Sequence, residues 1–504
     1  MLWLRRGLAV LLLLAQIVFL FMAVAQNNDV LQAINVLCQM IGILVAVHII
    51  TKPGSAGYKF MWVLFIVVLP IFGVPFYLLS ALPNDTKRFG KTITRIEHDT
   101  RELFFLSANA IEEAREELPE CSVQIAYLQN YAGFPVYSHT ETTYFSPGEQ
   151  FHEALLAELE KAERYIFLEY FIINEGKMWD SILEVLRRKA NEGVKVRVLY
   201  DEIGCFLLLP VEYPKTLAKY GIECCKFNRF IPFLSTKQNN RDHRKIAVID
   251  GKVAFTGGIN LADEYINELE KYGHWKDSGI LCRGPAAWSF AVMFLQMWEF
   301  ASHKKEDYKA FYPGEWGETL PACDGYVQPY ADSPTDTDKV GEHIYLHIIN
   351  NAKKYLYICT PYLIVDDNIL SALRLAAKSG VDVRIITPHK WDKWAVHMTT
   401  RSYYRELLSA GVRIYEYTNG FMHSKVFVSD DVTASVGTAN LDYRSLYLHF
   451  ECGALMQKTR AVMQAKSDFL QTLENCREIT LKDCKGSVPM RILQSILRLF
   501  APLM

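Results

Sequence analysis

Three long apolar runs open the chain. They are residues 8–25, 31–50 and 60–80, and none contains Asp, Glu, Lys or Arg. Each is close to the ~20 residues that a helix needs to cross a bilayer. The third run also contains Pro70, Gly73 and Pro75. Because these residue types bend or break helices, the pattern predicts a membrane anchor over residues 1–82 with two or three hydrophobic segments.

A cleaved signal peptide is the alternative for the first run. Arg5 and Arg6 precede it, and AVAQ at residues 23–26 resembles a cleavage site. A second apolar run follows almost at once, which favours an uncleaved anchor.

Basic residues give conflicting signals for the orientation in the membrane. Arg5, Arg6, Lys52 and Lys59 favour a cytoplasmic N-terminus and second loop, and three full spans would then place the rest of the chain outside. A basic cluster after the third run favours the cytoplasmic side instead. It consists of Lys87, Arg88, Lys91, Arg95 and Arg101. We predict a multi-pass protein of the cell membrane with cytoplasmic catalytic domains, which requires that the third segment is re-entrant or that the first does not span. An outside location of the catalytic part is the alternative.

The pattern changes beyond the anchor. Residues 83–120 are charged and largely helical in pattern, as in a solvated linker helix. From about residue 121, apolar strand-like runs alternate with amphipathic helical stretches, which is typical of α/β layering. Residues 488–504 predict an amphipathic C-terminal helix, which either lies in the membrane interface or packs on the domain.

The α/β part repeats itself. KAERYIFLEYFII at 161–173 corresponds to NAKKYLYICTPYLI at 351–364, and matching helix-like and strand-like stretches follow both in the same order. A repeat of this length is a duplicated domain rather than a solenoid unit. We therefore predict two α/β domains related by a pseudo-two-fold axis.

The boundary between the two domains is expected near residue 324. The stretch 324–339 is rich in Asp and Pro, as in a hinge, and it separates a first domain at 121–323 from a second at 324–487. The run 285–302 has aromatic residues and Met at helical spacing, interrupted by Glu299. It predicts a core helix that closes the first half, not another span.

Composition narrows the choice of partners. The 504 residues carry a net charge of −2, and half of them are hydrophobic, which is high for a wholly soluble chain. The absence of a basic excess argues against nucleic acid as a partner. The eleven cysteines show neither zinc-ligand spacing nor a disulfide framework, so the sequence predicts no metal site.

One polar pattern occurs in both repeats. Residues 239–260 and 421–440 each contain a His, a Lys two positions on, an Asp five positions further and an Asn ten positions after that. The two sets are His243, Lys245, Asp250 and Asn260, and His423, Lys425, Asp430 and Asn440. A single copy also fits a half-buried strand with a polar edge. Two copies at equivalent places in a duplication indicate one shared site.

Two imidazoles facing one site suit a double displacement at phosphorus. One can attack the phosphorus and form a covalent phosphoenzyme, and the other can pass a proton to the leaving oxygen and take one from the incoming nucleophile. Lys245 and Lys425 would offset the charge on the phosphate oxygens. Asn260, Asn440 and Thr438 could donate further hydrogen bonds, and no metal or cofactor is required.

Each histidine needs a hydrogen-bond acceptor on its far nitrogen to fix the tautomer. Asp277, in HWKDSGI, and Glu451, in LHFECGA, are the candidates. Either of them could instead be an ordinary paired carboxylate.

The twin HxKxxxxD motifs, followed by GGIN and GTAN, resemble those of the phospholipase D superfamily. The resemblance covers roughly residues 121–487. DHRKIAVIDGKVAFTGGINLADEY, together with LPIFGVPFYLLS, is similar to the bacterial cardiolipin synthase family in particular. This resemblance implies duplicated phospholipase D-like domains, each a mixed sheet flanked by helices. The two His–Lys–Asp triples, with Asp250 and Asp430, would be the catalytic set. The implied reaction transfers a phosphatidyl group between two phosphatidylglycerols without metal or cofactor.

Two positions depart from the superfamily pattern. Gly258 stands where Ser is common, and Asp242 stands where Asn is frequent. The sequence leaves the acceptor open, since a phospholipase D would use water and a phosphatidylserine synthase would use serine. A non-catalytic scaffold that binds membrane phospholipid is the alternative from another class. The sequence does not assign which histidine is the nucleophile.

Overall fold

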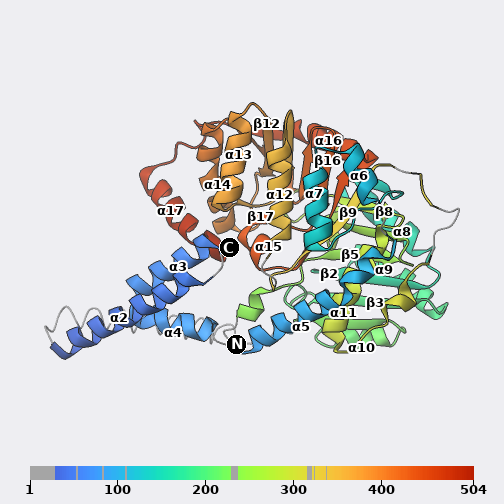
Figure 1. Ribbon diagram of the computed structural model, residues 1–504, viewed down its shortest axis with the longest axis horizontal. Coiled ribbons are helices and arrows are strands. Elements are labelled where there is room, and N and C mark those ends of the chain that lie inside the picture. The colour runs from blue at the N-terminus through green and yellow to red at the C-terminus, as the bar shows by residue number, and fades with distance from the viewer. Residues whose placement is uncertain are drawn as a thin grey trace.

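The computed structural model describes residues 29–52, 55–81, 84–107, 110–228, 236–314, 320–322, 324–335 and 338–504. The first predicted hydrophobic segment, residues 8–25, lies outside these residues, together with Arg5 and Arg6. The described chain forms a helical stalk beside a larger α/β body (Figure 1).

The stalk, which we call the membrane module, consists of helices α2 (Asp29–Thr51), α3 (Ala56–Val68) and α4 (Pro70–Ala81). Within the described residues, one helical stretch, Gln32–Thr51 of α2, is long and apolar enough to cross a bilayer. The predicted third segment is not one continuous helix, because it breaks at Leu69, immediately before Pro70.

Aromatic contacts fold α4 back against α3. Trp62 on α3 meets Tyr77 on α4 with ring centroids 5.2 Å apart, and Phe65 meets Phe72 at 5.3 Å. Gly73 permits this approach, because a Cβ atom there would lie 2.9 Å from the Ile66 Cα. The third apolar run is therefore a helical hairpin.

The first half of the body is built on a seven-stranded sheet. Its strands are β1 (Glu141–Phe145), β2 (Tyr165–Tyr170), β3 (Lys195–Asp201), β4 (Glu223–Phe227), β5 (Lys245–Ile249), β6 (Val253–Gly257) and β8 (Gly279–Arg283). They lie in the order β1-β8-β6-β5-β2-β3-β4, with β2, β3 and β4 parallel and the other neighbours antiparallel.

The second half repeats this arrangement. Its strands are β9 (Tyr326–Asp332), β10 (Tyr355–Cys359), β12 (Asp382–Pro388), β13 (Arg413–Tyr417), β15 (Val426–Ser429), β16 (Thr433–Gly437), β18 (Glu451–Gln457) and β19 (Cys476–Ile479). The order β9-β18-β16-β15-β10-β12-β13 matches the first sheet strand for strand, and β19 adds one edge strand. The predicted duplicated α/β fold with mixed sheets is confirmed.

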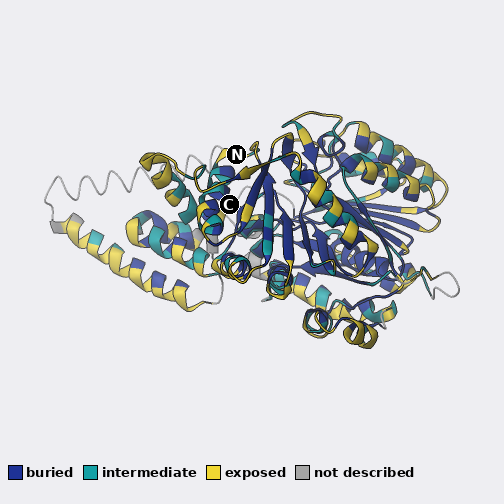
Figure 2. Cartoon of the chain, turned by 90° about the horizontal axis from the view of Figure 1, so that it is seen from above, coloured by how far each residue is buried: buried dark blue, intermediate teal, exposed yellow. Residues whose placement is uncertain are grey.

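Helices cover the outer face of each sheet. On the first sheet these are α8 (Gly148–Leu159), α9 (Lys177–Asn191) and α10 (Tyr213–Ala218). On the second sheet they are α12 (Val340–Asn351), α13 (Asp367–Lys378) and α14 (Trp394–Ser409). The central strands of both sheets, such as β2, β5, β10 and β15, are buried on both faces, which is why they read as largely apolar runs (Figure 2).

The inner faces of the two sheets share one hydrophobic core. Helices α11 (Ala287–Ser302) and α16 (Arg460–Leu473) lie in this core and contact strands of both halves. Residues Ala287–Trp298 of α11 are all buried. The run 285–302 is therefore a core helix, as predicted, and the structure places it between the halves.

The expectation of a solvated linker at 83–120 is wrong. The segment is helical, with α5 (Asn84–Thr100), the 3₁₀ helix η1 (Arg101–Ser107) and α6 (Ile111–Glu117), but α5 packs on α11. The Phe89 ring lies 5.1 Å from Phe300 and 6.3 Å from Phe450. Because these two residues belong to different halves, α5 is part of the seam between them.

Two segments near the expected domain boundaries also differ from prediction. The stretch 324–339 is not simply a hinge, because it supplies β9, which pairs with β18 along seven residues. The short helices α7 (Ser122–Ala126) and η2 (Tyr127–Ala132), expected in the first domain, contact α12 of the second half. Gln124 Nε2 donates to the Ile344 carbonyl at 3.3 Å, and the Tyr127 hydroxyl lies 2.7 Å from His343 Nδ1. Asp-rich and Pro-rich composition marks exposed chain but does not exclude an edge strand.

The chain ends in α17 (Val488–Leu499) and the short 3₁₀ helix η7 (Ala501–Leu503). Element η7 contacts α3 of the membrane module, and Phe500 packs against the apolar cluster of that module. The C-terminal end therefore joins the membrane module to the second half of the body.

Candidate active site

Two short parallel pairings bring the halves together at the twin motifs. Strand β14 (Gly420–Met422) pairs with β7 (His274–Lys276), and Asp242 forms a parallel bridge with Phe450. In both places, a strand that leads into a motif histidine lies beside a strand that leads into a carboxylate of the other half. The His243 N–H donates to the Phe450 carbonyl at 3.0 Å, and the His423 N–H donates to the Lys276 carbonyl at 2.8 Å.

Each histidine is held by a carboxylate from the opposite half. His243 Nδ1 lies 2.9 and 3.0 Å from the two Glu451 oxygens, and His423 Nδ1 lies 2.6 Å from Asp277 Oδ2. Both carboxylates are fully buried. The two predicted orienting residues thus lie against the histidines, but the partners are exchanged between the repeats. Because Nδ1 is occupied in both rings, Nε2 is the nitrogen left for chemistry.

Burial and charge keep both imidazoles neutral. Burial lowers the pKa of His243 to about 3, although the neighbouring Glu451 carboxylate pulls it upward. Burial, assisted by Lys425, lowers the pKa of His423 to about 4. Burial opposes ionisation of Glu451, yet His243 holds the pKa of this carboxyl well below its usual range. A neutral imidazole beside a carboxylate has the lone pair that a nucleophile needs.

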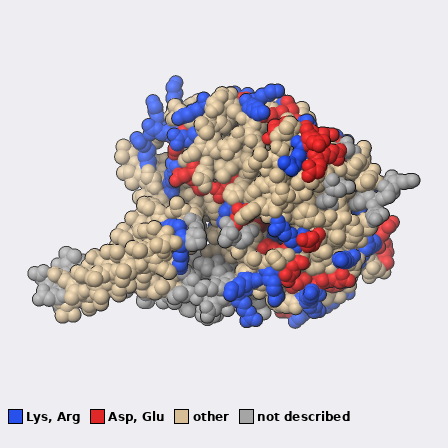
Figure 3. Space-filling view, in the orientation of Figure 1, with Lys and Arg blue, Asp and Glu red and all other residues tan. Residues whose placement is uncertain are grey.

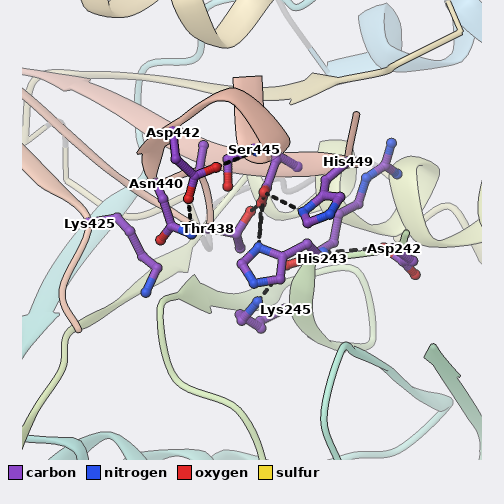
Figure 4. Close-up of polar contacts among 12 residues, drawn as sticks. Asp242, His243, Lys245, Lys425, Thr438, Asn440, Asp442, Ser445 and His449 are labelled. Atoms are coloured by element: carbon purple, nitrogen blue, oxygen red, sulfur yellow. Dashed lines mark hydrogen bonds and ion pairs between the residues drawn. The ribbon is translucent and has the colours of Figure 1, made fainter. Parts of the chain in front are cut away.

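The two motif lysines meet in the same site. Figure 4 shows Lys245 and Lys425, one from each half, around the His243 ring. Lys245 Nζ donates to the His243 carbonyl at 2.5 Å, and Lys425 Nζ donates to the His423 carbonyl. Burial lowers the pKa of Lys245 to about 8 and that of Lys425 to about 7. Two buried ammonium groups would attract a phosphodiester strongly, because little water screens them.

The motif aspartates lie away from the histidines. Asp250 follows the last residue of β5, whereas His243 precedes its first, so a five-residue strand at about 3.3 Å per residue separates them. Asp250 accepts the backbone N–H groups of Glu163, Arg164 and Tyr165 at 2.9, 2.8 and 2.7 Å. The geometry does not support a catalytic role for this residue, because its oxygens cap a loop.

Asp430 makes the same contacts in the second half. It accepts the N–H groups of Lys353, Lys354 and Tyr355 at 2.6, 2.9 and 2.9 Å. Both aspartates have positive φ, +55° for Asp250 and +56° for Asp430, which Asp tolerates better than most residues. The expectation of two complete catalytic triples is thereby reduced to two His–Lys pairs and two structural aspartates.

The expected phosphate donors are engaged in the walls of the site. The single hydroxyl proton of Thr438 is donated to Glu451 Oε2, so the expectation that it binds phosphate is wrong. Asn260 Oδ1 accepts from the Ile172 N–H at 3.1 Å, and its Nδ2 donates to the Tyr265 hydroxyl at 2.7 Å. Asn440 Nδ2 donates to Asp442 at 3.2 Å. Each amide retains a second Nδ2 hydrogen, so a contact with substrate remains a proposal for both.

Comparison with known proteins shows the family to which the chain belongs. A family model described as "Cardiolipin synthase, PLD-like domain" matches residues 155–282 and 345–473, one copy in each half. The chain belongs to the cardiolipin synthase family. A second model, "Phospholipase_D-nuclease N-terminal", matches residues 41–80 of the membrane module.

Relatives in this cardiolipin synthase family cover nearly the whole chain. A cardiolipin synthase of Geobacillus sp. (strain WCH70) is 34% identical over 98% of this chain and 99% of its own length. One from Alkalihalophilus pseudofirmus is 35% identical over 88% of both. An uncharacterized protein of Streptococcus mutans serotype c is 43% identical over 88% of this chain and 96% of its own.

A solved structure shares the fold. Phosphatidylserine synthase from Haemophilus influenzae Rd KW20 superposes with a TM-score of 0.54 at 15% identity, over 74% of this chain and 96% of its own length.

The structure explains one departure from the superfamily pattern. A Cβ atom on Gly258 would lie 2.1 Å from Asp277 Oδ1, so the carboxylate occupies the space of a side chain there. At the equivalent position of the second half, Thr438 fits and donates to Glu451. The glycine therefore leaves room for the carboxylate that orients His423.

Asp242, the other departure, belongs to a buried charged group. It lies beside Arg244 and Glu169, and the Arg244 Nη1 is 4.0 Å from Glu169 Oε1. Burial raises the pKa of Asp242 to about 6, and burial together with Asp242 raises the pKa of Glu169 well above its usual value. Packing of two carboxyl groups with one guanidinium favours sharing of a proton between them.

His449 is a site residue that sequence reasoning missed. Its ring centroid lies 5.4 Å from that of His243, and its Nδ1 lies 3.8 Å from Glu451 Oε1. In the repeat, the equivalent position, two residues before the carboxylate, holds Trp275, whose ring lies 5.1 Å from His423. Alignment of LHFE with HWKD would have found the pair. The two motif histidines thus have different neighbours, one an imidazole and the other an indole.

His243, His449 and Glu451 present three ligand atoms within 4.8 Å of one another, a spacing that could hold a divalent ion. Glu451, however, already accepts from His243 and from Thr438. In this arrangement the carboxylate acts as an orienting acceptor.

We expect Asp250→Ala to lower stability without removing the chemistry. Three backbone N–H groups would lose their acceptor, at about 2–3 kcal/mol in total. The melting temperature of the detergent-solubilised chain should fall, while the turnover per folded molecule stays within about two-fold. Asp250→Asn retains an oxygen acceptor and should melt close to the parent. A loss of turnover in folded Asp250→Ala would contradict the structural assignment.

We expect Gly258→Ala to impair turnover by displacing Asp277 from His423. A carboxylate that no longer orients its histidine costs about 10–100-fold in activity, so kcat per folded molecule should fall by about this factor. The melting temperature should fall as well, because the displaced buried carboxylate loses its partner. Thr438→Ser is the matched control, because it retains the hydroxyl that donates to Glu451. Unchanged kcat in Gly258→Ala would show that the Asp277 position is not needed.

Proposed function

We propose that this protein is a cardiolipin synthase that moves the phosphatidyl group of one phosphatidylglycerol to the headgroup hydroxyl of another, releasing glycerol. The observation that carries the proposal is the pair of buried imidazoles, each held at Nδ1 by a carboxylate of the opposite half. Membership of the family and the 34–35% identical cardiolipin synthases support this choice of donor and acceptor.

The proposed reaction has two displacements at one phosphorus. In the first, the Nε2 of one histidine forms a bond to phosphorus, the bond from phosphorus to the glycerol oxygen breaks, and the second histidine gives that oxygen a proton. In the second, the hydroxyl oxygen of another phosphatidylglycerol attacks, the N–P bond breaks, and the hydroxyl proton passes to the second histidine. The sum is cardiolipin and glycerol. Lys245 and Lys425 offset the charge on the phosphate oxygens in both steps.

We assign His243 as the nucleophile and His423 as the acid and base. Lys425 Nζ lies 2.9 Å from His423 Nδ1, and a cation at this position makes the imidazolium a readier proton donor. His243 has only the two Glu451 oxygens at its Nδ1, so positive charge that develops on the ring during attack is stabilised. The charge of a bound phosphodiester would in turn favour protonation of His423.

The substrates require a location at the bilayer. A lipid phosphodiester lies at headgroup level, and a body tethered by the membrane module meets it in two dimensions. We propose that the protein is multi-pass and that its catalytic body faces the cytoplasm. The basic cluster after the module, which includes Lys91 and Arg95, supports this side.

We expect purified full-length protein in mixed micelles of phosphatidylglycerol alone to form cardiolipin and glycerol in equal amounts. His243→Ala and His423→Ala should each reduce turnover by about 10³-fold or more, since the two act as a unit. Products are resolved by mass spectrometry, and an acid-quenched phosphatidyl adduct should map to His243. Phosphatidic acid as the sole product would identify a hydrolase instead.

We expect kcat/KM to fall as the pH rises through about 7 to 8. Lys425 and Lys245, with pKa values of about 7 and 8, carry the charge that attracts the phosphate below these values and lose it above them. Because kcat/KM reports the free enzyme, a pH profile from 6 to 9.5 measures this limb. Lys425→Arg stays charged and should move the limb to higher pH. Identical limbs in both proteins would contradict the assignment.

Labelling in intact cells tests the side of the membrane. A cysteine in place of Lys91, just after the membrane module, should react with a membrane-impermeant maleimide only after permeabilisation. Labelling of intact cells would place the catalytic body outside.

A further inference from the structure

Three cavities lie along the C-terminal helix α17. One of about 370 Å³ lies between α14 and α17, a second of about 480 Å³ extends to α13, and a third of about 560 Å³ follows the outer face of α17. The first two share Ser402, Arg405 and Arg498 in their linings, and the first and third share Arg491 and Ser495. The three cavities therefore adjoin one another, and we call them together the α17 groove.

Cations predominate in the inner part of the α17 groove. Its basic side chains are Arg374, Lys378, Arg401, Arg405, Arg491 and Arg498. Arg374 and Arg498 share the carboxylate of Glu406, at 2.8 and 3.1 Å. Among the described residues, no carboxylate lies within ion-pair distance of Arg405 or Arg491. Figure 3 shows Lys and Arg gathered at the upper left of the body, the side on which Figure 1 draws α17.

The outer part of the α17 groove is apolar and exposed. Helix α17 buries none of its residues. Val488, Ile492 and Ile496 are 68%, 56% and 49% exposed. Ile492 and Ile496 line the third cavity together with Arg491. An amphipathic helix with exposed aliphatic residues beside basic ones is suited to the boundary between headgroups and acyl chains.

The position of α17 next to the membrane module places the groove at the bilayer. Phe500, which follows α17, packs on the apolar cluster of the module. A Cβ atom on Gly57 of α3 would lie 3.3 Å from Pro502 Cγ, so the C-terminal end touches the start of α3. Only one turn of chain separates the groove from helices that are themselves apolar on their outer faces.

We propose that the α17 groove binds an anionic diacyl phospholipid, with its phosphodiester at Arg405 and Arg491 and its acyl chains along Ile492 and Ile496. This site is distinct from the two His–Lys pairs, so the lipid bound there is a structural ligand that fixes α17 and the second half on the bilayer. The proposal depends on the proposed function only in taking an anionic bilayer as the place where the protein works.

Photocrosslinking in bilayers tests this site. Benzoylphenylalanine replaces Gln494, which lines the groove, in the full chain carrying His423→Ala so that no turnover alters the lipids. The protein is reconstituted in equal amounts of phosphatidylglycerol and phosphatidylcholine, irradiated, and the captured lipid is identified by mass. We expect phosphatidylglycerol to be captured about five-fold more often than phosphatidylcholine.

Variants of Arg405 and Arg491 test whether these two guanidinium groups cause the preference for phosphatidylglycerol. Arg405→Gln with Arg491→Gln should abolish the preference, and Arg405→Lys with Arg491→Lys should retain most of it. The matched control is Arg115→Gln with Arg187→Gln, two exposed arginines on α6 and α9, which should change nothing.

Three outcomes would overturn the proposal. The first is absence of lipid capture, and the second is equal capture of both lipids by the parent. The third is loss of lipid capture when millimolar inorganic phosphate is present during irradiation, which would indicate a site for soluble phosphate. Since capture needs no catalysis, failure of the proposed transfer reaction would leave this result unaffected, and the reverse also holds.

Discussion

Two buried imidazole–carboxylate pairs, each formed between the halves of the body, are the interaction on which the active site depends. Neither half contains a complete pair, because His243 is oriented by Glu451 and His423 by Asp277. A buried carboxylate without its partner would be costly. Docking of the halves therefore brings each imidazole to its carboxylate and satisfies the buried charge in one step, and neither pair can form within a single isolated repeat.

The packing of the rest of the body holds the two halves together. The inner faces of the two sheets share one core with α11 and α16, and α5 closes the seam with the Phe89 ring, which touches residues of both halves. The motif aspartates act at a distance, since Asp250 and Asp430 hold the loops that lead into the central strands β2 and β10. The spacing shared by the two repeats thus places a His–Lys pair at one end of a strand and a loop-capping aspartate at the other.

The two halves are alike in fold but not in environment. His243 lies beside His449 and an acceptor that Thr438 supports, while His423 lies beside Trp275, Lys425 and a glycine that leaves room for Asp277. A duplication with two-fold pseudo-symmetry supplies two equivalent groups, and a double displacement needs two different ones. These neighbours supply the difference. A comparable asymmetry exists at the membrane, where only the second half carries α17 and its cationic groove.

The sequence alone determined the class of fold, the duplication and the two His–Lys pairs with their candidate carboxylate partners. Periodicity of apolar residues reports local structure, and a motif repeated at equivalent places reports a shared chemical task. Tertiary structure decided which groups meet. Each histidine lies against the carboxylate of the other half, and Asp250 and Asp430 lie outside the site. The Thr438 hydroxyl donates to Glu451, and His449 lies beside His243. Packing also buried the apolar face of α5, a charged helix that composition had marked as solvated. Spacing along a chain fixes the order of residues on a strand, whereas contacts between strands of different halves depend on packing that no local pattern encodes.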